Sequence, residues 1–333
     1  MAEHSQEYAN ARQGAALFDL SSRGKIEVVG PDAATFLHNL ATNDIKTLSP
    51  GAGCEAFLTT VKARVIAHLW IYRAEAPKPT LWLDVAPCRA VVVMTHLDRH
   101  LISEQVELLD HTSELAQFHL CGPEAPTLAA QVLGQAAAEL APLRHRPGTQ
   151  EGVLSIRRHD LLGVPGFDVV ATPDAARRLW QELTTSGAMP AGLETLETLR
   201  IEAGMPVDDV DMDENRFVVE VGRTAQAISY AKGCYLGQEP IVMARDRGQV
   251  NRMLLGVKLP AGPVASGAKL FRDGQEVGAV TSSTHSPRLG CAIALAYVRR
   301  GSQETGTVLE IETTTGRGEA VVSALPFGEG EAS

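Results

Sequence analysis

Short apolar runs and helical patterns follow one another through the first three quarters of the chain. The run Gly24–Gly30 is typical of a strand, and Pro31 and Asp32 then begin a helix in which Phe36 and Leu40 share one face. The same patterns predict strands over 55–60, 64–73, 80–85, 106–109, 115–121, 153–159 and 167–171, and helices over 88–100, 127–140, 175–183 and 193–203. Because the strands are grouped between helices, they favour an α+β arrangement of antiparallel sheets over a doubly wound parallel sheet.

After residue 250 the pattern changes to short apolar runs separated by Gly, Pro and Ser. These runs lie at 254–259, 269–271, 276–282, 291–297, 308–311 and 320–322. Their length and spacing predict a small β-barrel or sandwich. We therefore expect two domains, an N-terminal module over residues 1–250 and a C-terminal β-barrel domain over residues 251–327.

Charge and composition exclude several classes of function. The 333 residues carry a formal net charge of −10, so no overall field attracts the protein to nucleic acid or to anionic lipid. No apolar run approaches the length of about 18 to 20 residues that spans a bilayer, and the first residues lack the features of a signal or transit peptide. We expect a cytoplasmic monomer that binds neither nucleic acid nor membrane.

The five cysteines indicate neither a disulfide framework nor a metal site. They are widely spread, and none belongs to a C-x-x-C pair or has a histidine at metal-ligand spacing. The sequence therefore predicts no bound metal.

One cysteine, Cys234, has an unusual setting. It lies between Gly233 and Gly237, just before a helix in which Pro240 is expected at the first position. The glycines permit close approach of another molecule, and Lys232 together with the helix N-terminus would favour the thiolate. The alternative is a small buried cysteine in a turn shaped by glycine. The residues alone leave both interpretations open.

Two further features have competing interpretations. Asp209, Asp211, Asp213 and Glu220 have the spacing of a calcium loop, but Glu214 stands where that loop needs glycine, so calcium is not expected. These carboxylates form either a solvated acidic loop or a segment that positions the helix over 193–203 beside a site. His68 lies in an apolar strand, where a histidine is usually a core residue with satisfied hydrogen bonds.

Two segments carry a family resemblance: Lys232-Gly-Cys-Tyr-x-Gly-Gln-Glu239, and Leu199-Arg-Ile-Glu-Ala-Gly-Met-Pro206 before it. With the start of the chain, where Phe18-Asp-Leu-Ser21 precedes Gly24-Lys-Ile26, they resemble the YgfZ-type folate-binding proteins. Those proteins are related to the glycine cleavage system T-protein, an aminomethyltransferase. The resemblance implies a GcvT-like fold of antiparallel sheets with helices, a ferredoxin-like duplication around a central channel, followed by the barrel. It also implies tetrahydrofolate or another reduced folate as ligand, and iron–sulfur client or assembly proteins as partners.

The resemblance also assigns candidate ligand-binding residues. Asp168, in Gly166-Phe-Asp168, is similar to the glutamate with which the T-protein holds the pterin, whose adjacent N–H and amino groups suit one carboxylate. Arg200 is placed to meet the glutamate tail of the folate, and its alternative is an ion pair with Glu197 or Glu202. Tyr235 is expected to shape the mouth of the site.

One departure from the family bears on activity. The T-protein strand Val-Ile-Asp-Asp-Leu carries the aspartate that works on the folate nitrogen, whereas this chain has Val65-Ile-Ala67-His68-Leu69. Loss of such a group costs about 10²–10⁴-fold in rate, which leaves open whether the chain is an enzyme.

Three functional hypotheses follow. In the first, an accessory protein for iron–sulfur cluster assembly or repair uses Cys234 as its working thiol, with Lys232 favouring the thiolate. In the second, a folate-dependent aminomethyltransferase or demethylase uses His68 or the acidic loop in place of the missing aspartate. The third is a scaffold with a vestigial folate pocket.

Overall fold

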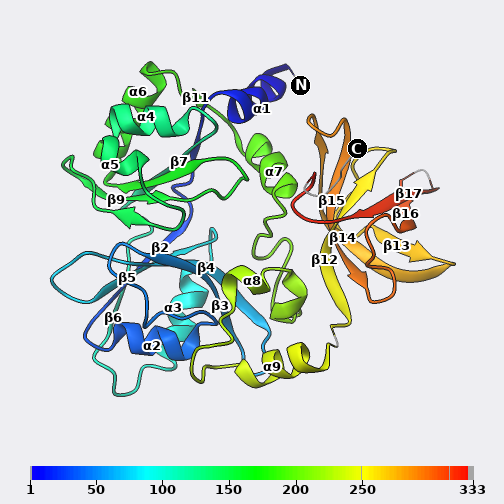
Figure 1. Ribbon diagram of the computed structural model, residues 1–333, viewed down its shortest axis with the longest axis horizontal. Helices are drawn as coiled ribbons and strands as arrows, with labels where there is room; N and C mark the ends of the chain where they lie inside the picture. Colours follow the sequence, from blue (N-terminus) through cyan, green and yellow to red (C-terminus); the bar gives the residue numbers. More distant parts are fainter. Residues whose placement is uncertain (1, 249, 315, 329–333) are drawn as a thin grey trace.

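Two sheets and a closed barrel form the framework of the computed structural model, which describes residues 2–248, 250–314 and 316–328. In Figure 1 the two sheets lie one above the other and the barrel lies to their right, with helix α7 between the upper sheet and the barrel. Almost all strand pairs are antiparallel, and helices cover the sheets. The predicted α+β class with a C-terminal barrel is confirmed.

The first sheet has five strands in the order β3-β4-β5-β2-β6. Alternate residues of its strands are apolar and face helices α2 and α3. Leu37 of α2 and Val93 of α3 are fully buried in the same core cluster as Ile26 and Leu69. The elements are β2 (Gly24–Val29), α2 (Ala33–Leu40), β3 (Gly53–Thr59), β4 (Val65–Arg73), β5 (Thr80–Val85), α3 (Ala90–Asp98) and β6 (Glu107–Asp110).

The second sheet has six strands in the order β11-β1-β7-β10-β9-β8 and repeats the plan of the first. Strands β1 and β11 form its parallel pair, and helices α4 to α6 bury their apolar sides against β7, β9 and β10. The elements are α1 (Ala2–Gln13), β1 (Ala16–Asp19), β7 (Ala116–Cys121), α4 (Ala125–Val132), α5 (Gln135–Ala138), β8 (His145–Arg146), β9 (Val153–Arg158), β10 (Gly166–Ala171), α6 (Pro173–Thr185) and β11 (Met189–Pro190).

Helical segments connect the second sheet to the barrel. Helix α7 (Leu193–Glu202) leads into an acidic loop over residues 206–214, followed by the 3-10 helix η1 (Val218–Val221), α8 (Thr224–Ala227) and α9 (Gln238–Arg247). The barrel closes in the order β12-β15-β14-β13-β16-β17. Its strands are β12 (Arg252–Leu259), β13 (Lys269–Arg272), β14 (Gln275–Ser286), β15 (Cys291–Arg299), β16 (Val308–Thr313) and β17 (Gly316–Ser323).

Two predicted details are wrong. The helix expected over 127–140 is divided into α4 and α5 because Gly134 adopts a positive φ of 96°, which breaks the helical hydrogen bonding. Helix α9 begins at Gln238, so Pro240 is its third residue, where a backbone N–H still has no partner within the helix.

The domain division between residues 250 and 251 and the cytoplasmic location stay predictions. In the described part of the chain, no helix combines the length and apolar character needed to cross a membrane.

Gly237 determines how the turn before α9 packs. Its φ is +82°, and an added Cβ would come within 2.5 Å of Thr59 Oγ1 and 2.7 Å of the Thr60 carbonyl oxygen. The close approach that the sequence predicts at this glycine is therefore made by the β3–β4 turn of the same chain.

We expect Gly237→Ala to lower the free energy of unfolding by about 1–3 kcal/mol, because it adds a clash to a backbone conformation that alanine disfavours. Chemical denaturation measures the change. Gly233→Ala is the matched control, since a Cβ at Gly233 meets nothing within 4 Å. Equal losses in both variants would contradict this account.

Candidate functional site

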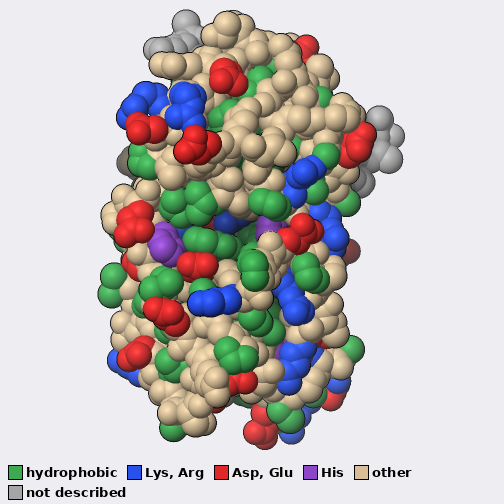
Figure 2. Space-filling model, turned by 90° about the vertical axis from the view of Figure 1, so that its left-hand side faces the viewer, with side chains coloured by type: hydrophobic (Ala, Val, Ile, Leu, Met, Phe, Trp, Pro, Cys, Tyr) green, Lys and Arg blue, Asp and Glu red, His purple; other side chains and the backbone are tan. Residues whose placement is uncertain are grey.

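A partly enclosed cavity lies where strand β4, helix α7 and the acidic loop meet. Its volume is about 80 Å³, several times the 10–15 Å³ or so that one water molecule needs. Its walls are mainly apolar, and the lining residues are Leu20, Arg23, His68, Trp70, Ala86, Leu161, Leu162, Leu196, Arg200, Met205, Pro206, Val207 and Asp208. Figure 2 shows the molecule from the left of Figure 1, where histidine, hydrophobic and charged side chains all reach the surface midway up, at the height where the two sheets meet.

Hydrogen bonds that link Arg223, Glu55 and His68 hold the His68 imidazole in a fixed orientation at this cavity. His68 Nε2 lies 2.7 Å from Glu55 Oε1 on the adjacent strand β3. Arg223, between η1 and α8, donates to both carboxylate oxygens of Glu55. Burial raises the pKa of Glu55, but the hydrogen bonds from Arg223 and His68 outweigh it and lower this pKa to about 2. Glu55 is thus ionised at neutral pH and fixes the orientation of the imidazole.

The acidic loop brings a second carboxylate to the same place. Both oxygens of Asp208 accept from the backbone N–H of His68, at 3.3 and 3.1 Å. Asp208 lines the cavity and is 5% exposed. Burial raises its pKa, and the neighbouring His68 opposes the shift. A carboxylate with a raised pKa exchanges a proton more readily near neutral pH than an ordinary aspartate does.

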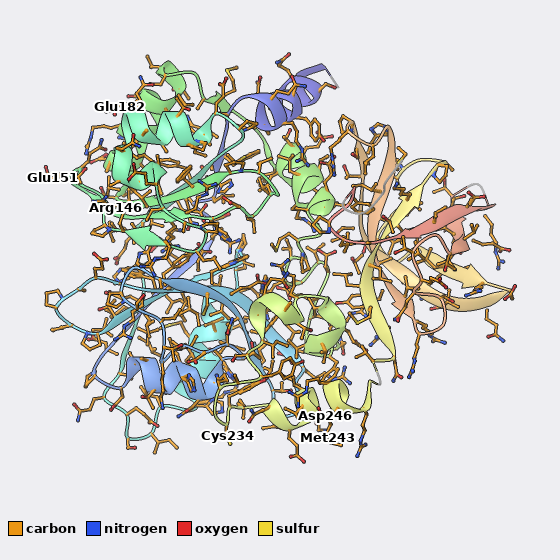
Figure 3. All side chains as sticks on the ribbon, in the orientation of Figure 1. Arg146, Glu151, Glu182, Cys234, Met243 and Asp246 are labelled. Carbon is orange, nitrogen blue, oxygen red and sulfur yellow. The ribbon has the colours of Figure 1, made fainter. Side chains whose placement is uncertain are left out.

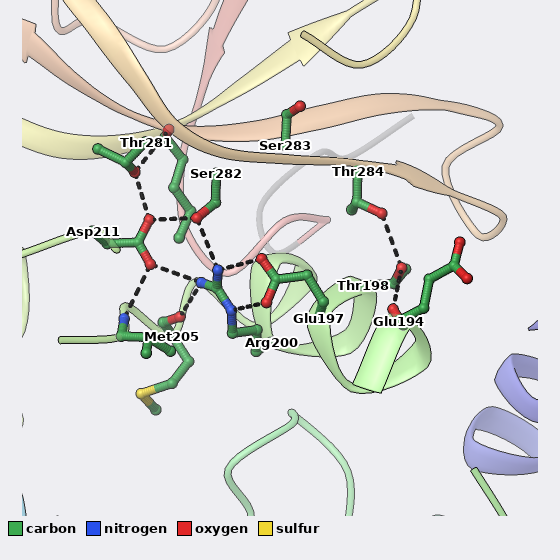
Figure 4. Close-up of polar contacts among 12 residues, drawn as sticks. Glu194, Glu197, Thr198, Arg200, Met205, Asp211, Thr281, Ser282, Ser283 and Thr284 are labelled. Carbon is green, nitrogen blue, oxygen red and sulfur yellow. Dashed lines mark hydrogen bonds and ion pairs between the residues drawn. The ribbon is translucent and has the colours of Figure 1, made fainter. Parts of the chain in front are cut away.

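The barrel holds this loop in place through Asp211, as Figure 4 shows. Asp211 accepts from the hydroxyls of Thr281 and Ser282 on β14, from Arg200 Nη1 and from the backbone N–H of Val207. Of the four carboxylates in this segment, Asp211 forms an ion pair with Arg200 of the helix over 193–203, whereas Asp209 pairs with Arg89 and Glu220 with Arg252. That the segment positions the helix beside a site stays a prediction.

Aromatic rings connect the cavity to the second sheet. His68 stacks on Phe57 with centroids 4.8 Å apart and contacts Trp70 at 4.7 Å. Trp70 in turn meets His159 edge to face at 4.7 Å. Since His68 and Trp70 are two residues apart on β4, the strand places both on one face.

Asp168 lies at the end of this series and is already paired. Its two oxygens lie 2.7 Å from His119 Nδ1 and 2.9 Å from His159 Nδ1. Burial lowers the pKa of His119, but the Asp168 carboxylate outweighs it and raises this pKa to about 10. Asp168 is not among the residues that line the cavity, so its role as the pterin acceptor stays a prediction.

Arg200 borders the cavity, but all five of its N–H donors are used within the protein. They reach both oxygens of Glu197, the Met205 carbonyl, Asp211 and Ser282. The alternative given above, an ion pair with Glu197, is confirmed. Its role toward a ligand stays a prediction.

Cys234 lies apart from the cavity. Figure 3 shows it at the lower edge of the molecule, on the turn before α9. The side chain is exposed, and Cys234 does not line the cavity. The alternative of a small buried cysteine is therefore wrong for this position, while its chemistry stays a prediction.

Lys232 and Tyr235 take part in packing. Burial lowers the pKa of Lys232 to about 8, and its ammonium group donates to the carbonyls of His38, Ala41 and Asn43. The same group lies 4.5 Å from the centroid of the Tyr235 ring, which belongs to an apolar cluster with Phe57. The structure gives Lys232 these partners, and its predicted effect on the Cys234 thiol stays untested.

The sequence did not single out several residues that the structure brings to the site. Trp70 has a detectable signal, because it shares the β4 face with His68. No local sequence pattern indicates Glu55, Arg223 or Asp208. Glu55 lies 13 residues from His68 in the sequence and Asp208 lies 140 residues from it, so only the folded structure brings them together. Among the described residues, no group of three or more His, Cys, Asp or Glu side chains is placed to hold a metal ion.

Comparison with known families gives two matches. Residues 1–228 match the family described as GCVT N-terminal domain, and residues 252–328 match the glycine cleavage T-protein C-terminal barrel domain.

Relatives cover nearly the whole chain. The aminomethyltransferase of Rubrobacter xylanophilus is 32% identical over 294 residues, covering 88% of this chain and 78% of that protein. A chloroplastic relative from Arabidopsis thaliana, named only provisionally as a transferase, is 30% identical over 320 residues, or 94% of this chain and 71% of that protein. The crystal structure of aminomethyltransferase T from Bartonella henselae superposes with a TM-score of 0.90 at 24% identity, covering 98% and 90% of the two chains. That structural match shows the shared fold.

We expect Arg200→Gln to lower the free energy of unfolding by about 3–5 kcal/mol, because it leaves the Asp211 carboxylate buried without its cation. Thermal and chemical denaturation measure the loss. Arg177→Gln, at an exposed arginine, is the control and should change stability by about 0.5 kcal/mol or less. A stable Arg200→Gln variant that loses only ligand affinity would instead support the ligand-binding role.

Proposed function

The chain belongs to the glycine cleavage T-protein family, and from this we propose that it binds a reduced folate and transfers a one-carbon unit between an aminomethyl donor and the folate. Names of relatives support the reaction class, since several are aminomethyltransferases. The observation that carries the proposal is the position of Asp208 against the backbone of His68.

Asp208 brings a carboxylate to a strand whose family counterpart carries aspartate. The family strand has aspartate at the positions of both Ala67 and His68; here Ala67 is buried in the core of the first sheet, and the carboxylate of Asp208 accepts from the backbone N–H of His68, on the cavity side of β4. Two contacts hold the acidic loop in this position. Asp208 accepts from the His68 N–H, and Asp211 accepts from the barrel hydroxyls of Thr281 and Ser282. A group held in this way has the fixed placement that proton transfer requires.

The cavity suits a flat, partly polar ring. Trp70 offers an aromatic surface, and Leu161, Leu196 and Met205 contribute apolar walls. The polar residues that line the cavity are Asp208, His68, Arg23 and Arg200. An apolar pocket with a few convergent polar groups is the usual form of a small-molecule site, and the ring system of a folate has this mixed character.

In the proposed reaction two folate nitrogens each form a bond to the carbon of the aminomethyl group and each lose a proton. The bonds from that carbon to the amine and to the donor atom that carried it both break, and the departing amine and the donor atom each gain one proton. Asp208 is placed to take up and return such a proton, because its pKa is raised by burial. His68, oriented by Glu55 and Arg223, is a second group for the same transfer.

We expect Asp208→Asn to lower the rate of folate-dependent transfer by about 10²–10⁴-fold, because the amide cannot accept the proton. The measurement is formation of methylenetetrahydrofolate from tetrahydrofolate and an aminomethyl donor, with His68→Gln tested in parallel. Asp209→Asn is the matched control, since Asp209 is 59% exposed and pairs with Arg89.

Folate binding is measured separately from turnover. At a concentration of 100 times the dissociation constant, a bound ligand adds about 2.7 kcal/mol to stability, which a thermal shift detects. An Asp208→Asn variant that still binds folate and reacts at the unchanged rate would rule out the role of Asp208. No thermal shift in the unaltered protein would support the scaffold hypothesis instead.

A second candidate is the YgfZ-type accessory role in iron–sulfur cluster assembly or repair. The observation that favours it is the exposed thiol of Cys234 within the segment Lys232–Glu239. In this hypothesis the thiol meets a client or assembly protein at the surface, independently of the cavity.

We expect Cys234→Ala to abolish support of an iron–sulfur-dependent enzyme in cells if this second role holds, without lowering thermal stability or folate-dependent transfer. Cys88→Ala is the control, because Cys88 is also exposed. Full support by the Cys234→Ala variant would exclude the accessory role of this thiol.

A further inference from the structure

A groove rich in arginine lies between Arg64, just before β4, the segment around η1 and the barrel. It has a volume of about 740 Å³ and is distinct from the cavity at Asp208, with which it shares no lining residue. Within the described residues, four arginines and one glutamate line it, along with Phe217, Val250 and Asn251; the charged residues are Arg64, Glu220, Arg252, Arg299 and Arg300.

Only two of the four arginine side chains in the groove have a hydrogen-bond acceptor among the described residues. Glu220 accepts from Arg252 Nε at 3.1 Å, and Arg64 donates to the Asn215 carbonyl. The side chains of Arg299 and Arg300 are exposed, and no described residue forms a hydrogen bond or an ion pair with either. The groove therefore presents guanidinium groups that are free to bind a ligand.

Strand pairing brings two of these cations together. In the barrel Arg252 lies directly opposite Arg299 in the antiparallel pair of β12 and β15. Like charges directly opposite one another destabilise a sheet. This concentration of positive charge is unexpected in a chain with a net charge of −10. Glu220 compensates Arg252 in part, and an anion bound by the side chains of Arg252 and Arg299 would relieve the remaining repulsion.

We propose that this groove binds a multiply charged anion bearing phosphate or carboxylate groups. Arginine suits both, because its planar fork donates two parallel hydrogen bonds to either group. Arg299 and Arg300 are the principal donors, and Phe217 and Val250 provide an apolar surface for the remainder of the ligand. The site goes beyond the proposed transfer reaction and does not depend on it.

Binding is tested on the full chain without folate, at low salt, by calorimetry with tripolyphosphate and with citrate as probes. We expect the double variant Arg299→Gln/Arg300→Gln to bind about tenfold more weakly or worse, since each lost charged hydrogen bond lowers affinity by that order. The control Arg177→Gln/Arg317→Gln makes the same change in net charge at exposed arginines outside the groove and should bind as the unaltered protein does.

The two probes distinguish phosphate from carboxylate as the preferred group, and groove-dependent binding of either supports the site. Binding of neither probe, or equal weakening in the groove and control variants, would overturn it. Unchanged folate-dependent transfer in the double variant would show that the groove and the cavity act independently.

Discussion

The arrangement of the candidate site depends on one buried charge, the Glu55 carboxylate. Removal of a carboxylate from water is costly unless cations and hydrogen bonds compensate it, and Arg223 and His68 do so here. Because Arg223 follows η1 while Glu55 and His68 lie on adjacent strands, the pairing ties the segment after the acidic loop to the first sheet. The same contact fixes the imidazole that borders the cavity.

The acidic loop is the second constraint, and it connects the barrel with the first sheet. Asp211 is held by β14 and by Arg200 of helix α7, while Asp208, three residues earlier, contacts β4. A carboxylate on a loop would ordinarily be mobile and solvated. Here it has a fixed position in a cavity because both sides of the loop are anchored. The barrel thus contributes to the site without lining the cavity with its own strands.

Much of the fold could be predicted because the spacing of apolar residues and the residue composition of each segment are properties of the local sequence. The strand at 65–73 and the helix at 193–202 follow directly from the apolar pattern. The break at Gly134 was missed because alanine-rich sequence on both sides favours helix, and the backbone angle of one glycine decided otherwise. In the site, the apolar pattern and the family comparison identified His68, but the exposed position of Cys234 and the paired state of Arg200 required coordinates.

By itself the sequence determined most of the strands and helices, the barrel-like pattern after residue 250, the resemblance to folate-binding proteins and the absence of the family's aspartate in the stretch Ala67-His68. Only the tertiary structure decided what stands in its place. Asp208 reaches His68 across 140 residues of sequence, and Arg223 reaches Glu55 across 168. Local patterns carry no information about such contacts, because they form only when the packing of sheets, helix and barrel brings distant segments together.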